Sequence, residues 1–149
     1  MINIRHAGIY VQNIKKEAEF YIKTFGMSLI CEKNRESNEL LDDLFKMDNA
    51  EIFTTKLITE LGCKLGSGEM LELIEVSFPC NHKQIDNSKI YNTGIAHVAI
   101  GVDDIEEVCS KIILNGGTLK TVIHLMSNGK KCAFATDPEG NWIELIQNI

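Results

Sequence analysis

The alternation of apolar and polar positions follows the same course in both halves of the chain. In the first half, residues 5–11 form an apolar strand, and the apolar positions from Ile14 to Phe25 follow the helical period. Asn13 is the expected N-cap of this helix and Gly26 its expected end. Strand-like runs follow at 28–31, 52–57 and 70–76. The first half is therefore predicted to have the order β-α-β-β-β.

The second half repeats this order. Residues 95–102 align with residues 4–11 at an offset of 91, and Asp103 or Asp104 is the expected cap of a helix that ends at Gly116-Gly117. Strand-like runs follow at 118–124, 131–136 and 142–147. We therefore predict an α+β fold of two βαβββ modules in a single domain, residues 1–78 and 94–149, joined by a polar linker at 79–93.

The first module is longer than the second. His6 and Glu72 are 66 positions apart, whereas the corresponding residues His97 and Glu144 are 47 positions apart. Much of the extra length lies in residues 36–49, where a short amphipathic stripe is formed by Leu40, Leu41, Leu44 and Phe45. This insertion is either a surface segment that packs its own apolar side or a cap over a pocket that shapes substrate choice.

Composition narrows the class of protein. A chain of 149 residues with 44% hydrophobic and 24% charged residues is typical of one soluble globular domain. The net charge of −6 and the lack of a basic patch argue against nucleic acid as a partner. No apolar run approaches a membrane span, so we expect a cytoplasmic protein without membrane association. The cysteines are scattered, which indicates reduced thiols, with Cys109 in the core: Cys31, Cys63, Cys80, Cys109 and Cys132.

Four ionisable residues fall at matching points of the two modules: His6, Glu72, His97 and Glu144. Because side chains alternate across a strand, each Glu shares its face with large apolar residues, where an unpaired carboxylate would cost several kcal/mol. Two imidazoles and two carboxylates suit one divalent cation, such as Ni, Zn, Co, Mn or Fe. Taken singly, each residue could be an ordinary core His or surface Glu. Their coincidence with the repeat favours a metal site, and the other two histidines, which lack that support, are expected at the surface: His82 and His124.

Several motifs resemble the vicinal-oxygen-chelate superfamily, which includes glyoxalase I, methylmalonyl-CoA epimerase, extradiol dioxygenases and fosfomycin-resistance proteins. They are Arg5-His6-Ala7-Gly8-Ile9, Leu71-Glu72-Leu73, Ala96-His97-Val98-Ala99, and the ending Asp137-Pro138-Glu139-Gly140 with Glu144 four residues on. The resemblance implies two βαβββ modules whose sheets form an open, cupped barrel around a metal. It also implies a small-molecule substrate and, as in many small members, a homodimer.

The order His, Glu, His, Glu is similar to that of bacterial glyoxalase I, a lactoylglutathione lyase. This implies a metal-dependent lyase or isomerase, in which Glu144 or Glu72 moves a proton next to a carbonyl through a metal-bound enediolate. The expected substrate pocket then includes residues that share strand faces with the ligands, namely Tyr10, Met70 and Trp142.

Two positions depart from the bacterial glyoxalase I pattern. Tyr10 and Val76 stand where that enzyme usually has the Arg and the Asn that it uses on glutathione. The thiol of the substrate is therefore left open. The alternatives are an isomerase similar to methylmalonyl-CoA epimerase, an Fe-dependent extradiol dioxygenase, and a module that binds a metabolite or antibiotic. Drug-binding relatives generally lack the metal ligands, which counts against the last.

Overall fold

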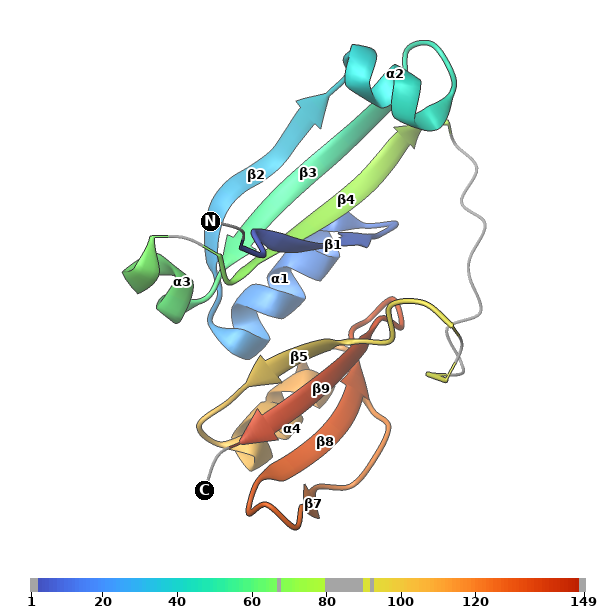
Figure 1. The fold of residues 1–149 in the computed structure, drawn as a ribbon. Coiled ribbons are helices and arrows are strands. Elements are labelled where there is room, and N and C mark those ends of the chain that lie inside the picture. The colour runs from blue at the N-terminus through green and yellow to red at the C-terminus, as the bar shows by residue number, and fades with distance from the viewer. Residues whose placement is uncertain (1–2, 67, 80–89, 92, 148–149) are drawn as a thin grey trace. The chain divides into compact units, whose positions relative to one another are not determined.

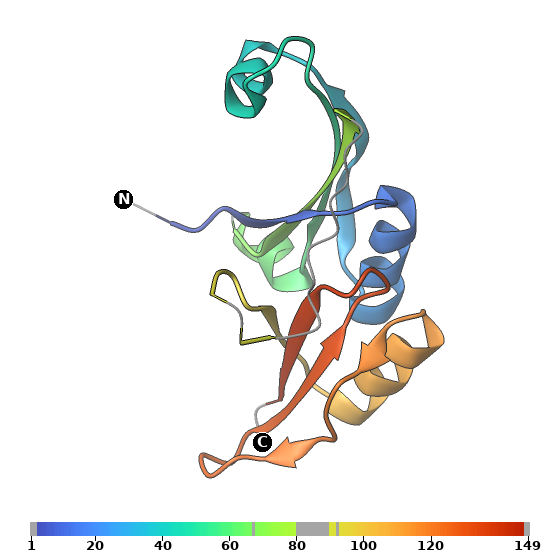
Figure 2. The same cartoon turned by 90° about the vertical axis from the view of Figure 1, so that its right-hand side faces the viewer.

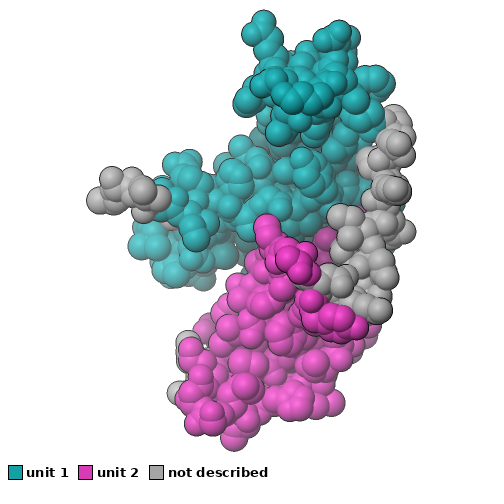
Figure 3. Space-filling model, turned by 45° about the vertical axis from the view of Figure 1, so that its right-hand side comes forward, with its two compact units in different colours: residues 1–84 teal, residues 85–149 magenta. Residues whose placement is uncertain are grey.

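The chain divides into two compact units, residues 1–84 and 85–149 (Figure 3). The structure, a computed structural model, describes residues 3–66, 68–79, 90–91 and 93–147. Most of the predicted linker at 79–93 lies outside the described residues, as do Cys80 and His82. Each unit carries one open β-sheet, and the predicted α+β class with two repeated modules is confirmed.

Unit 1 folds around a four-stranded sheet with the strand order β1-β4-β3-β2 (Figure 1). Strand β1 runs parallel to β4, and the other neighbours are antiparallel. Along the chain the elements are β1 (His6–Tyr10), α1 (Ile14–Phe25), β2 (Ser28–Glu36), α2 (Glu39–Phe45), β3 (Glu51–Ile58), α3 (Glu60–Leu65) and β4 (Met70–Phe78). The predicted βαβββ order is confirmed, with α2 and α3 added between strands.

Helix α1 covers one face of this sheet (Figures 1 and 2). On the helix, Ile14 and Tyr21 are fully buried, and on the covered face of the sheet Leu57, Leu71 and Leu73 are buried as well. Burying each such side chain contributes roughly 1.5–3 kcal/mol, so this interface holds the unit together. Because residues alternate along a strand, the even-numbered positions of β3 and β4 face away from α1.

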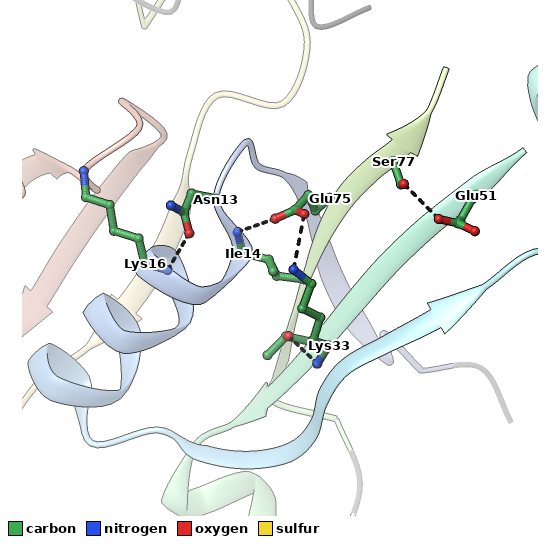
Figure 4. A network of polar contacts seen from close by, with 8 residues as sticks. Asn13, Ile14, Lys16, Lys33, Glu51, Glu75 and Ser77 are labelled. Atoms are coloured by element: carbon green, nitrogen blue, oxygen red, sulfur yellow. Dashed lines mark hydrogen bonds and ion pairs between the residues drawn. The ribbon is translucent and has the colours of Figure 1, made fainter. Parts of the chain in front are cut away.

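The start of α1 is tied to the last strand of its sheet. Asn13 caps the helix by accepting a hydrogen bond from the N–H of Lys16 at 3.0 Å (Figure 4). Glu75, on β4, accepts a second bond from the N–H of Ile14, at 2.9 Å. The Nζ atom of Lys33 lies 3.7 Å from Oε1 of the same carboxylate. Two of the unpaired N–H groups at the helix N-terminus are thus satisfied, one of them by a residue distant in sequence.

Unit 2 repeats this architecture with shorter connections. Its elements are β5 (Val98–Gly101), α4 (Ile105–Leu114), β6 (Thr118–Leu119), β7 (His124–Leu125), β8 (Lys131–Thr136) and β9 (Trp142–Gln147). The sheet order is β5-β9-β8-β6, with β7 also paired to β8, and β5 is parallel to β9. Asp104 caps α4, as one of the two predicted candidates. Gln147 accepts a bond from the N–H of Ile105 at 2.8 Å, so it takes the place that Glu75 has in unit 1.

The prediction of one strand over residues 118–124 is wrong. The segment forms two short strands, β6 and β7, because the two residues Lys120 and Thr121 between them both hydrogen-bond to Phe134. The N–H groups of Lys120 and Thr121 both donate to the carbonyl of Phe134, and the Thr121 hydroxyl accepts from the Phe134 N–H at 3.0 Å. The hydroxyl thereby replaces a backbone acceptor, which interrupts the regular ladder.

The turn predicted at residues 137–140 sets the register of β8 and β9. Asp137 is buried, and its carboxylate accepts bonds from the N–H groups of Glu139 and Asn141 at 3.1 and 2.8 Å. Gly140 adopts a φ of 91°, which favours glycine. With the turn fixed in this way, Glu144 of β9 pairs with Phe134 of β8.

The insertion at 36–49 forms α2 and packs part of its apolar side on the sheet. Leu41 is buried in a cluster with Ala50 and Ile52, and the partly buried residues against this cluster are Phe45, Met47, Ile74 and Val76. Leu40 and Leu44 remain exposed. The packing interpretation is therefore confirmed for Leu41 and Phe45. Since Ile52, Ile74 and Val76 face away from α1, the insertion covers one end of the same face that carries Glu72.

The four cysteines in the described ranges are free, and Cys109 is buried in α4 as predicted. Burial raises the pKa of the Cys109 thiol, with a smaller contribution from Glu106, so this thiol is a poor nucleophile.

Within the part of the chain that is described, no helix has the length and apolar character to cross a membrane.

We expect Glu75→Ala to lower the free energy of unfolding by about 1 kcal/mol, the usual cost of losing a helix cap. Glu75→Gln should stay close to wild type, because Gln147 provides the same amide acceptor in unit 2. Urea unfolding followed by circular dichroism measures both. A Glu75→Ala variant as stable as wild type would show that the bond to Ile14 contributes nothing.

Candidate metal centre

The four predicted ligands form two His–Glu pairs, one in each unit. In unit 1, His6 Nε2 lies 3.1 Å from Glu72 Oε2. In unit 2, His97 Nε2 lies 3.1 Å from Glu144 Oε2. The repeat seen in the sequence is therefore also a repeat of side-chain geometry, with the same two atoms at the same separation.

Strand register explains why the pairs form. Gly8 of β1 is the partner of Glu72 on the parallel strand β4, and Ala99 of β5 is the partner of Glu144 on β9. His6 precedes Gly8 by two positions, and His97 precedes Ala99 by two. Residues two apart share a face of the sheet, so each His lies on the same face as its Glu. The sequence predicts the shared faces, whereas the register comes from the structure.

The pairs fit the chemistry of a divalent cation. Two ligands that each lie about 2.1 Å from a cation, at right angles, are about 3 Å apart, which matches both pairs without any shift. Imidazole nitrogen with carboxylate oxygen suits the borderline divalent metals. In addition, Nδ1 of His97 is buried and has no hydrogen-bond partner among the described residues. This is the ring nitrogen that does not face Glu144, so it bears on what holds the imidazole in place and not on the cation itself.

The side chains of both pairs are partly buried, and each pair remains accessible to solvent. The exposed fraction is 40% for His6 and 14% for Glu72, against 30% for His97 and 23% for Glu144. A carboxylate covered to this degree is costly to leave without a hydrogen-bonding or cationic partner. Each has an imidazole in place, and a small ligand can still approach from solvent.

Taken over the described ranges, the structure gathers no group of three or more His, Cys, Asp or Glu side chains that could hold a metal. Its two pairs belong to separate units, each described by itself. A single cation held by all four residues therefore stays a prediction, and what the structure supports directly is the geometry of each half.

The two halves differ in one residue that the sequence reasoning misses. In unit 1, Lys56 of β3 is the cross-strand partner of Glu72, and its Nζ lies 3.1 Å from Glu72 Oε1. In unit 2, Phe134 takes the corresponding place beside Glu144, and its ring meets the His97 ring edge-on at 5.4 Å. The signal in the sequence is a lysine within the apolar run at 52–57, on the face of the candidate ligands.

The predicted pocket residues lie on the faces that carry the ligands. Met70 pairs in register with His6, and Tyr10, at the end of β1, is 58% exposed. Trp142 meets Phe134 edge-on at 6.5 Å, with Lys120 Nζ 5.8 Å from the centre of the indole. Their contact with a substrate stays a prediction. The remaining described histidine, His124 on β7, is exposed as expected.

Comparison with known proteins gives a consistent result. A model of the Glyoxalase/Bleomycin resistance protein/Dioxygenase superfamily matches residues 3–145. The chain is 32% identical to a probable lactoylglutathione lyase of Vibrio cholerae, covering 97% of this chain and 90% of that protein. It is 28% identical to a lactoylglutathione lyase of Schizosaccharomyces pombe, of which it spans 46%, less than half the length. A glyoxalase family protein from Bacillus cereus has the same fold, with a TM-score of 0.87 over 100% of this chain and 95% of that one, at 16% identity.

Proposed function

Because the chain belongs to the Glyoxalase/Bleomycin resistance protein/Dioxygenase superfamily, we propose that it is a metal-dependent lyase or isomerase of the glyoxalase I type. Such an enzyme moves a proton between carbon atoms next to a carbonyl of a small substrate. The observation that carries the proposal is the duplicated His–Glu pair, with the same 3.1 Å separation in both units. Relatives named lactoylglutathione lyase support the same reaction class.

The proposed ligands of one divalent cation are His6, Glu72, His97 and Glu144. Each chain carries enough of these residues to bind one cation, whether the two pairs at a cation come from one chain or from two copies of a homodimer. Bound there, Ni, Zn, Co, Mn or Fe would supply a Lewis acid for two neighbouring oxygens of the substrate. We also propose a cytoplasmic location, in keeping with the free thiols of the described cysteines.

Glu144 is the proposed proton carrier. Its Oε2 faces His97, and within the described part of the chain its other oxygen has no partner, which leaves Oε1 to meet a substrate C–H. Glu72 differs, because Lys56 already occupies its Oε1. A carboxylate with a free oxygen can take a proton from carbon and return it to the neighbouring carbon without breaking another contact.

The side chains beside each pair favour a substrate with an apolar portion. Phe134 and Trp142 form an aromatic edge beside Glu144, and Tyr10 and Met70 share the face of His6. We propose that these residues contact the substrate, a thiol adduct of an α-oxoaldehyde. Tyr10 and Val76 provide no cationic or amide group for glutathione, so the preferred thiol is proposed to be another one.

Metal binding tests the ligand set. We expect the wild-type protein to bind one divalent ion per chain, measured by calorimetry and elemental analysis. His6→Ala and His97→Ala should each weaken binding by at least about tenfold, since even outer-shell changes cost that much. His124→Ala, an exposed histidine on β7, is the matched control and should bind as wild type does. If all three variants bind equally well, the proposed ligands are wrong.

Turnover tests the role of Glu144. With metal-loaded protein and methylglyoxal hemithioacetals of several thiols, Glu144→Gln should lower kcat by about 100-fold or more, the usual worth of a general base. Glu107→Gln, an exposed residue of α4, should keep wild-type turnover. Unchanged activity of Glu144→Gln would reject its role. If the wild type converts no hemithioacetal but exchanges the α-proton of a methylmalonyl thioester, the epimerase alternative replaces the lyase.

A further inference from the structure

Glu72 is held at both of its oxygens. Oε2 lies 3.1 Å from His6 Nε2, and Oε1 lies 3.1 Å from Lys56 Nζ. The carboxylate is largely covered, whereas the Lys56 side chain is 38% exposed and reaches Glu72 from the neighbouring strand. The three residues share one face of the sheet of unit 1, on the side away from α1.

Unit 2 provides an internal comparison for this arrangement. Phe134 stands beside Glu144 at the position that Lys56 has beside Glu72. The His–Glu distance is 3.1 Å in both units, so the lysine is not needed to form the pair. Its effect must therefore lie in the charge and in the second oxygen of the carboxylate.

We propose that Lys56 is a positioning residue that keeps Glu72 Oε1 engaged and sets the affinity of this half of the centre for a cation. While the ammonium holds Oε1, Glu72 offers one oxygen beside His6, and a second contact from the same carboxylate is prevented. The ammonium also places a unit positive charge next to the carboxylate. It competes with a divalent ion for Glu72 and opposes its binding.

This inference rests on the proposed metal centre and adds a role for a residue that is not a ligand. Two consequences follow. Coordination by a single oxygen of Glu72 leaves a position on the cation free for a substrate oxygen. Glu72 would also bind the cation more weakly than Glu144 does, while Glu144 keeps the oxygen that can move a proton.

The test compares the affinity of Lys56 variants for Zn²⁺ and Co²⁺, measured by competition with a chelating dye. Removal of the charge in Lys56→Met should tighten binding by roughly tenfold, because an opposing unit charge a few ångströms from a divalent ion is lost. Lys56→Arg keeps the charge and should bind as wild type does. The visible spectrum of the Co²⁺ form should change in Lys56→Met alone, as Glu72 gains a second contact with the ion.

Two further variants separate this role from a structural one. Lys64→Met removes the Lys64–Glu60 pair on the exposed surface of α3 and should leave the affinity unchanged. Phe134→Lys places an ammonium beside Glu144 and should weaken binding by a similar factor. If circular dichroism shows that Lys56→Met does not fold, Phe134→Lys still tests whether an ammonium beside the carboxylate lowers the affinity for the cation.

The outcomes are distinct from those of the proposed function. If the wild type binds a divalent ion and Lys56→Met binds it equally or more weakly, the role of Lys56 is rejected and the centre stands. The role of Lys56 is also rejected if Phe134→Lys, folded, binds as wild type does. If the wild type binds no divalent ion, both the role of Lys56 and the metal-dependent function fall.

Discussion

Parallel hydrogen bonding between the first and the last strand of each module is the constraint on which the candidate centre depends. It joins β1 to β4 and β5 to β9, segments far apart in sequence, in a register that places Glu72 opposite Gly8 and Glu144 opposite Ala99. A shift of one residue would turn each carboxylate to the helix-covered face. The helix caps from Glu75 and Gln147 act on the same strands and fix them against α1 and α4.

The two units differ in the residue that lies beside the carboxylate on the sheet face of each His–Glu pair. Each half has a well-covered carboxylate that requires a positive or hydrogen-bonding partner. In unit 1, Glu72 has both His6 and Lys56, whereas in unit 2 Glu144 has His97 and an aromatic neighbour. One duplicated pair thus yields a carboxylate with charged or imidazole partners at both oxygens and, among the described residues, another with such a partner at one oxygen only.

Much of this arrangement is predictable from sequence because its signals are local. Asn13 and Gly26 mark the ends of α1, and the run at 131–136 marks β8. What the sequence reasoning misses depends on contacts between distant segments. The Thr121 hydroxyl divides one expected strand into β6 and β7 by bonding to another strand, and Lys56 gains its meaning only from its pairing with Glu72 across the sheet. The helix α3 is missed for another reason, since it is only six residues long.

The most direct test of a single cation held by both pairs is X-ray absorption spectroscopy of the Zn²⁺-loaded protein. Two imidazoles and two carboxylates per chain predict a first shell of nitrogen and oxygen, with the outer-shell scattering of two imidazole rings per zinc ion and no sulfur. One imidazole per zinc, with two ions bound per chain, would mean that each pair binds alone. Sulfur in the shell would place the metal at cysteines, and either result would contradict the account.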